Sequence, residues 1–121
     1  MYNYYLRNMF HKNLLIKPGG LTIGGRPLNL ADSTTPTFIL NRKDDHIAPW
    51  CCGYAGTKVF SVPKKFILGG SGHVAGIFNH PSAEKYGYWT NDDISKPFNE
   101  WFDEATMTPG SWWEEWVLWL K

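Results

Sequence analysis

The sequence has 121 residues and a formal net charge of +1, which suits one domain with a modest core. Acidic and basic residues are interleaved, so neither nucleic acid nor an anionic membrane surface is indicated as a partner. No segment approaches the ~20 apolar residues of a transmembrane helix, and the first residues lack the basic and apolar regions of a signal peptide.

The N-terminal residues predict an amphipathic helix that ends near Asn13, because their apolar side chains recur with helical spacing. These side chains are Tyr2, Tyr5, Leu6, Met9 and Phe10. A Pro-Gly-Gly sequence then ends the helix. Residues 21–23 and 28–30, joined through Gly24 and Gly25, predict a small β-hairpin.

Two short apolar runs, residues 37–40 and 66–68, predict buried strands of a parallel sheet, because each run leads into turn residues. Between them, residues 50–60 predict a helix, although Gly53 and Gly56 weaken helix propensity. Its expected buried side carries Cys51, Ala55 and Val59. A strand, helix and strand of this length predict a right-handed βαβ unit. Both strands then end at the carboxyl edge of the sheet, where open α/β sheets bind ligands.

The C-terminal third has few regular signals until its last residues. Residues 79–110 are expected to be mostly irregular, and a stretch this long is usually functional or depends on a partner. Pro97 predicts the start of a short helix. Ser111 and Glu114 form an S-x-x-E capping box for a terminal helix. The apolar positions of that helix, which we expect to face the core, are Trp113, Trp116, Val117 and Leu120.

An acid and a histidine follow the two strands of the βαβ unit. Asp45 comes after the first strand and His73 after the second, which is two thirds of a catalytic triad: the acid fixes the imidazole tautomer and the imidazole moves a proton. In α/β-hydrolases the nucleophile precedes both, within G-x-[SC]-x-G at a strand-to-helix turn. None of the 121 residues form that motif. The sequence therefore predicts the second half of a catalytic site.

Other candidates have stronger structural interpretations. Ser71 imitates a nucleophile elbow, but it lies almost beside its own base and is better interpreted as part of a tight turn that presents His73. Cys51 and Cys52 follow the acid instead of preceding it, which favours packing. Because they are adjacent, they are also poorly placed to form a disulfide, and a reducing cytoplasm fits best. The histidines lack zinc-ligand spacing, so we expect neither a metal nor another cofactor.

Four sequence blocks, in order, resemble the C-terminal portion of the class I poly(3-hydroxyalkanoate) synthases, the poly-β-hydroxybutyrate polymerases. The similarity runs from about Tyr5 to Leu120. The blocks are residues 45–50 (Asp-His-Ile-Ala-Pro-Trp), 70–76 (Gly-Ser-Gly-His-Val-Ala-Gly), 88–92 (Tyr-Trp-Thr-Asn-Asp) and 110–113 (Gly-Ser-Trp-Trp).

The resemblance implies an acyltransferase that polymerises (R)-3-hydroxyacyl-CoA, with release of CoA, through a cysteine thioester. It matches Asp45 and His73 to the catalytic acid and histidine, and His46 to a substrate-binding histidine near the CoA arm. The family's nucleophilic cysteine belongs upstream of the matched region, so we expect the chain to be a fragment that is inactive alone. An upstream N-terminal portion and the polyester chain are then its expected partners, and a homo-oligomer is left open. The cytoplasm, at the surface of polyester granules, is the expected location.

The resemblance also implies an organisation: the C-terminal part of one α/β-hydrolase-like domain, with an incomplete sheet of parallel strands and flanking helices. Residues 1–30 would be the end of a cap region and the hairpin, residues 36–78 the βαβ unit, and residues 79–121 an irregular segment and the Trp-rich terminal helix. Two alternatives stay open. One is part of a thioesterase or polyester depolymerase that uses the same acid and histidine, and the other is a non-catalytic remnant or interaction module of a split gene.

Overall fold

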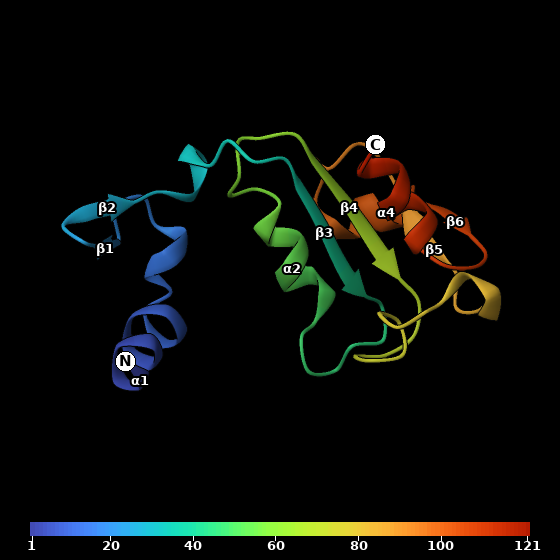
Figure 1. Cartoon of the computed structure of the whole chain (residues 1–121), viewed down its shortest axis with the longest axis horizontal. Helices are drawn as coiled ribbons and strands as arrows, with labels where there is room; N and C mark the ends of the chain where they lie inside the picture. The colour runs from blue at the N-terminus through green and yellow to red at the C-terminus, as the bar shows by residue number, and fades with distance from the viewer. The chain divides into compact units, whose positions relative to one another are not determined.

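Figure 1 shows the computed structural model, which describes residues 1–121. The chain divides into two compact units. The first comprises residues 1–35 with 59–62, and the second comprises residues 36–58 with 63–121. None of the helices has the length and hydrophobicity needed to cross a lipid bilayer.

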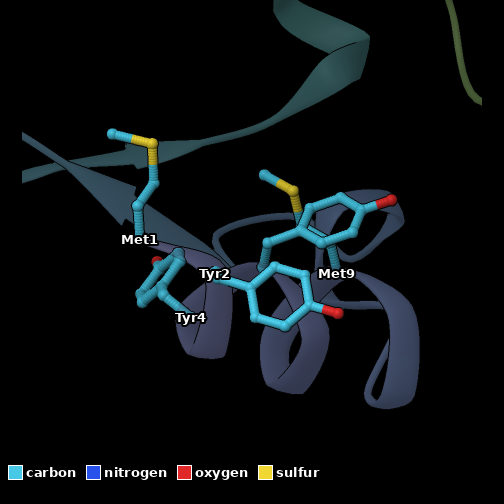
Figure 2. A pocket seen from close by; sticks show the side chains of 5 residues that line it. Met1, Tyr2, Tyr4 and Met9 are labelled. Carbon is cyan, nitrogen blue, oxygen red and sulfur yellow. The ribbon is translucent and has the colours of Figure 1, made fainter.

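The first unit begins with helical turns, but not with the regular α-helix that the spacing predicts. A short α1 (Tyr2–Tyr4) continues into the π-helix η1 (Tyr5–His11), where the Lys12 N–H donates to the Arg7 carbonyl five residues back. The wider turn changes which residues share a face. Of the predicted apolar face, Leu6 and Met9 are half-buried, whereas Tyr2, Tyr5 and Phe10 are exposed. Figure 2 shows the open apolar hollow on this helix, lined by Met1, Tyr2, Tyr4, Tyr5 and Met9.

The rest of the first unit contains the predicted hairpin. Strands β1 (Leu21–Ile23) and β2 (Arg26–Leu28) pair antiparallel, and both glycines of the turn, Gly24 and Gly25, have positive φ, as a tight two-residue hairpin turn requires. The second strand begins two residues earlier than expected because Ile23 pairs with Arg26. The flanking elements are the 3₁₀ turns η2 (Leu14–Ile16) and η3 (Leu30–Asp32).

The second unit is built on a four-stranded sheet in the order β3-β4-β5-β6. The predicted parallel pair is confirmed: β3 (Thr37–Arg42) and β4 (Lys64–Gly69) run side by side with Arg42 opposite Gly69. The expectation of an all-parallel sheet is wrong, because β5 (Tyr88–Thr90) and β6 (Thr106–Thr108) join antiparallel. No crossover helix follows β4, so the chain can only return in the opposite direction.

The expectation that residues 79–110 are mostly irregular holds for just over half of the stretch, but it missed β5 and β6. Besides β5 and β6, this stretch contains the 3₁₀ turn η4 (Pro81–Ala83) and the short helix α3 (Phe98–Asp103), which begins after Pro97 as predicted. Each of the two strands has only three residues, which is too short to show the alternation that identifies a strand from sequence.

Both faces of the sheet are covered. Phe66 and Leu68 of β4 point to one face, where they pack with Tyr54 of α2 (Trp50–Gly56) and Trp101 of α3. Between them, Ile67 points to the other face and packs in a cluster with Trp112, just before α4 (Trp113–Trp119). Figure 1 shows α2 and α4 on opposite sides of the β3–β4 pair. The second unit is thus a three-layer α/β arrangement.

The buried sides of the two longer helices differ from the predicted ones. In α2 the deeply buried residue is Tyr54, whereas Ala55 is exposed. The helix ends at Gly56 instead of residue 60, and there the backbone changes to i→i−3 hydrogen bonds, with the Thr57 N–H donating to the Tyr54 carbonyl at 2.9 Å. A Cβ at Gly53 would lie 2.1 Å from Oδ1 of the Asn41 side chain. A larger residue at this position would therefore require the end of the Asn41 side chain to move.

Helix α4 packs on the sheet through Trp113 and through Trp119, whose ring centroid lies 6.1 Å from that of Phe38. Trp116, Val117 and Leu120 are exposed, contrary to expectation. The predicted capping box forms only in part. Ser111 Oγ accepts from the Trp113 N–H, as a cap should, but its own hydroxyl donates to the Asn79 carbonyl. The helix start is therefore tied to the loop that follows β4.

Candidate active site

The candidate site lies where β3 and β4 end. Their arrowheads reach the same edge in Figure 1, and the two following loops are bonded to each other. The Lys43 N–H donates to the Gly69 carbonyl (2.8 Å), and the Asp44 N–H donates to the Ser71 carbonyl (3.2 Å). This parallel arrangement brings Asp45 and His73 into direct contact. The Nδ1 atom of His73 lies 3.0 Å from Oδ1 and 2.9 Å from Oδ2 of Asp45.

The carboxylate of Asp45 is buried, and the residue as a whole is only 5% exposed. Its Oδ1 accepts from the backbone N–H groups of Ile47 (3.0 Å) and Ala48 (2.9 Å), and its Oδ2 accepts from Nη2 of Arg42. Burial alone would raise the pKa of Asp45. The hydrogen bonds from Ala48, His73 and Ile47, with the charge of Arg42, nevertheless lower that pKa well below its ordinary value. The acid is therefore ionised near neutral pH.

His73 sits on a tight loop that depends on unusual backbone positions. Ser71 has a φ of +68°, which confirms its place in a turn that presents His73. A Cβ at Gly76 would come within 2.5 Å of the Gly70 carbonyl oxygen and 2.6 Å of Arg42 Cγ. The His73 side chain is 41% exposed, so with Nδ1 held by Asp45 its second nitrogen is the one available to a substrate. A buried acid that orients an accessible imidazole is the arrangement of a general base.

The remaining sequence candidates lie in different surroundings. His46 follows Asp45 and is exposed. Cys51 is half-buried and Cys52 is exposed, so the expectation that both cysteines pack in the core is wrong for Cys52. A hydrogen bond and charge from Cys51 raise the pKa of the Cys52 thiol, which leaves less of the reactive thiolate.

His80 has a local structural role. Its Nδ1 accepts from the Ser82 N–H, which caps the start of η4, and lies 2.8 Å from the Ser82 hydroxyl oxygen. The centroid of its ring lies 5.6 Å from that of the Trp113 ring. No three His, Cys, Asp or Glu side chains are grouped so that they could hold a metal ion.

Arg42 is the site residue that the sequence reasoning missed. Its side chain is 9% exposed and lies against both Asp45 and His73. Arginine is rarely buried unless it is paired, so an arginine at the end of an apolar strand, three residues before an aspartate, was the available signal.

No family model matches the chain. Among curated proteins, it is 41% identical over 119 residues to the poly(3-hydroxyalkanoate) polymerase subunit PhaC of Cupriavidus necator, which covers 98% of this chain and 20% of that protein. It is 35% identical over 118 residues to the Rhizobium etli subunit of the same name, a match that covers 98% of this chain and 18% of that protein. It is 37% identical over 121 residues to the poly(3-hydroxyalkanoate) polymerase of Methylorubrum extorquens, a match that covers 99% of this chain and 20% of that protein. The chain thus spans about a fifth of the length of these relatives.

Proposed function

The chain is a relative of the poly(3-hydroxyalkanoate) polymerases, matching their C-terminal portion, and on that premise we propose that it carries the acid and histidine of such a polymerase's catalytic domain. The reaction would be the transfer of a 3-hydroxyacyl group from CoA to a growing polyester. The observation that carries the proposal is the contact between buried Asp45 and accessible His73 at the carboxyl edge of parallel strands.

In this proposal His73 performs the proton transfers. With Nδ1 bound to Asp45, its other nitrogen takes the proton from the nucleophile or from the incoming 3-hydroxyl group, and Asp45 stabilises the resulting imidazolium. The cysteine nucleophile would come from outside these 121 residues, since none of them form its elbow motif. The first unit would then contain the end of the cap region.

The surroundings of the pair suit an acyl-CoA. His46, next to Asp45, is exposed and would contact the CoA arm. Ile47 beside it and Val74 and Phe78 in the His73 loop are all at least 60% exposed. These apolar side chains would line the path of the hydroxyacyl chain and the polyester, and contact with the polyester would place the protein at a granule surface.

A split polymerase tests the proposal. The chain would be co-expressed with the part of the Cupriavidus necator polymerase that precedes the matched region, and release of free CoA thiol from (R)-3-hydroxybutyryl-CoA would be followed. We expect no release by the chain alone and release by the pair. His73→Ala and Asp45→Asn should each lower the rate by about 10³–10⁴-fold, because triad members act as a unit.

His46→Ala should cost much less than either change, since His46 would only contact the substrate. Asp44→Asn, an exposed acid on the same loop, is the matched control and should leave the rate unchanged. Equal losses at His46 and His73 would show that the base is wrongly assigned. Release of CoA by the chain alone would refute the requirement for an upstream nucleophile.

A further inference from the structure

An open apolar hollow lies beside α4, outside the candidate site. Its volume is about 420 Å³, and the residues that line it are Pro81, Trp113, Glu114, Val117 and Leu118. The four residues from α4 are spaced i, i+1, i+4 and i+5, so they form one stripe of the helix surface. Val117 and Leu118 of this stripe are exposed. Small-molecule sites are mostly apolar and have volumes of about 300–1,000 Å³, so the hollow is large enough for a ligand.

The hollow is tied to the loop that carries His73. The indole Nε1–H of Trp113 donates to the Ile77 carbonyl at 3.0 Å. The ring of His80 contacts the same indole, with the two ring centroids 5.6 Å apart. Exposed Phe78 therefore lies in the chain between two residues that contact Trp113. The loop that would guide the polyester past the base leads directly to a wall of the hollow.

The charges around the hollow narrow down the chemistry of its ligand. No lysine, arginine or histidine lines it, and its one charged residue is Glu114. A second acidic residue, Glu84, lines a neighbouring hollow that shares Pro81 and Glu114 with the first. Two carboxylates disfavour an anionic lipid surface or a fatty-acid carboxylate, because like charges repel. An uncharged and mainly aliphatic chain fits both the apolar wall and the acidic rim, and a polyester has this chemistry.

We propose that the hollow on α4 binds the growing polyester after the chain has passed His73. The identity of this ligand rests on the proposed polymerase function. The Trp113 ring and the side chains of Val117 and Leu118 would cover aliphatic segments of the polyester, since removal of apolar surface from water favours association. Because the hollow is separate from the Asp45–His73 pair, product bound there would leave the pair free for the next acyl-CoA.

The test uses the whole ¹⁵N-labelled chain and the methyl ester of a short (R)-3-hydroxybutyrate oligomer, which is an uncharged probe. The indole Nε1–H signal of Trp113, assigned with Trp113→Phe, reports on the hollow because this indole forms part of its wall. We expect this signal to shift in a saturable way during a titration with the oligomer. The indole signal of Trp101, which is fully buried elsewhere in the core, should stay unchanged.

Variants of α4 test which side chains bind. Val117→Ser combined with Leu118→Ser removes the apolar stripe and should weaken oligomer binding on the order of tenfold. Leu120→Ser is the matched control. Leu120 follows the same helix and is 64% exposed, close to the 62% of Leu118, but it does not line the hollow, so the affinity should be unchanged. Near-UV circular dichroism checks that each variant is folded.

The absence of a saturable Trp113 shift in the wild type would overturn the inference, and that measurement needs no variant. Equal affinities of the double variant and Leu120→Ser would also overturn it. Since binding is measured without turnover, failure of the split polymerase to release CoA would count against the proposed function. Absence of oligomer binding, with CoA release intact, would count against this inference alone.

Three further measurements test other occupants of the hollow. A Trp113 shift with phosphatidylcholine vesicles as large as that with the oligomer would assign the hollow to a membrane surface. A shift on dilution of the chain alone would assign it to a second copy of the chain. Loss of the oligomer-induced shift in the reconstituted split polymerase would assign it to the upstream portion. Each of these results would overturn the inference.

Discussion

Replacing Gly76 with alanine tests whether the close fit beneath the His73 loop matters as much as the structure indicates. The added Cβ would lie 2.5 Å from the Gly70 carbonyl oxygen and 2.6 Å from Arg42 Cγ. Ordinary carbon–oxygen contacts begin at about 3.3 Å, so the loop must move by roughly 0.8 Å. The Gly70 oxygen belongs to the backbone and cannot rotate away, so most of this movement falls on residues 70–76.

The expected cost follows from this overlap. Forcing an extra carbon into a packed site costs about 1–3 kcal/mol of unfolding free energy. If His73 is the base, as proposed, a shift of its side chain by nearly 1 Å can lower the rate by about 10²-fold. Urea denaturation followed by tryptophan fluorescence measures the first effect. The seven tryptophans report global unfolding together, and one of them, Trp112, donates its Nε1–H to the Gly76 carbonyl at 2.9 Å. CoA release by the split polymerase measures the second effect.

Gly56→Ala is the matched control. This glycine ends α2, and a Cβ there would meet nothing within 4 Å. The alanine should stabilise the protein by about 0.4–1 kcal/mol, because it restricts the unfolded chain. We therefore expect Gly76→Ala to lower the unfolding free energy and Gly56→Ala to raise it. If Gly76→Ala were as stable and as active as the wild type, the close contact with Arg42 and the Gly70 carbonyl would be refuted.

Two further predictions concern stability. The folded protein lowers the pKa of Asp45, although burial opposes this shift. The ionised carboxylate therefore contributes its full stabilisation above the ordinary pKa of about 3.9. This stabilisation is lost as the pH falls through the lower pKa of the folded state. In Asp45→Asn, the unfolding free energy measured by urea titration should therefore depend less on pH below about pH 4. The same pH dependence in the variant and the wild type would contradict the lowered pKa of Asp45. Trp101→Phe should cost about 1–3 kcal/mol, because it leaves the Asn91 carbonyl without the Nε1–H that bonds it at 2.9 Å. Trp116→Phe, at a position 41% exposed, should cost less than 0.5 kcal/mol in the same urea titration, and equal losses would argue against the buried bond.

The sequence alone determined the pair of parallel strands and the edge at which the acid and histidine meet. Both strands are apolar runs that lead into turn residues, and a parallel pair with a connecting helix places its two loops at one edge. The contact between Asp45 and His73 follows from that topology, which local sequence signals are enough to predict. The hairpin at Gly24 and Gly25 was predictable because glycine readily adopts positive φ, and the turn at Ser71 was predictable because glycines flank that serine.

Only the tertiary structure decided the rest. Strands β5 and β6 have three residues each and depend on their neighbours in the sheet: β5 pairs with the edge of β4, and β6 pairs with β5. Which face of α4 is exposed depends on how the helix lies on the sheet, with Trp113 and Trp119 packed and Trp116 exposed, and the spacing of its apolar residues does not predict this. Arg42 shows the limit most clearly, because its local sequence reads as a solvated charge at a strand end. Its burial depends on Gly76, 34 positions later in the chain, and on a carboxylate that the same loop folds over it. The only local signal is an arginine at the end of an apolar strand, three residues before an aspartate, and it does not show the burial, which comes from contacts made only in the folded chain.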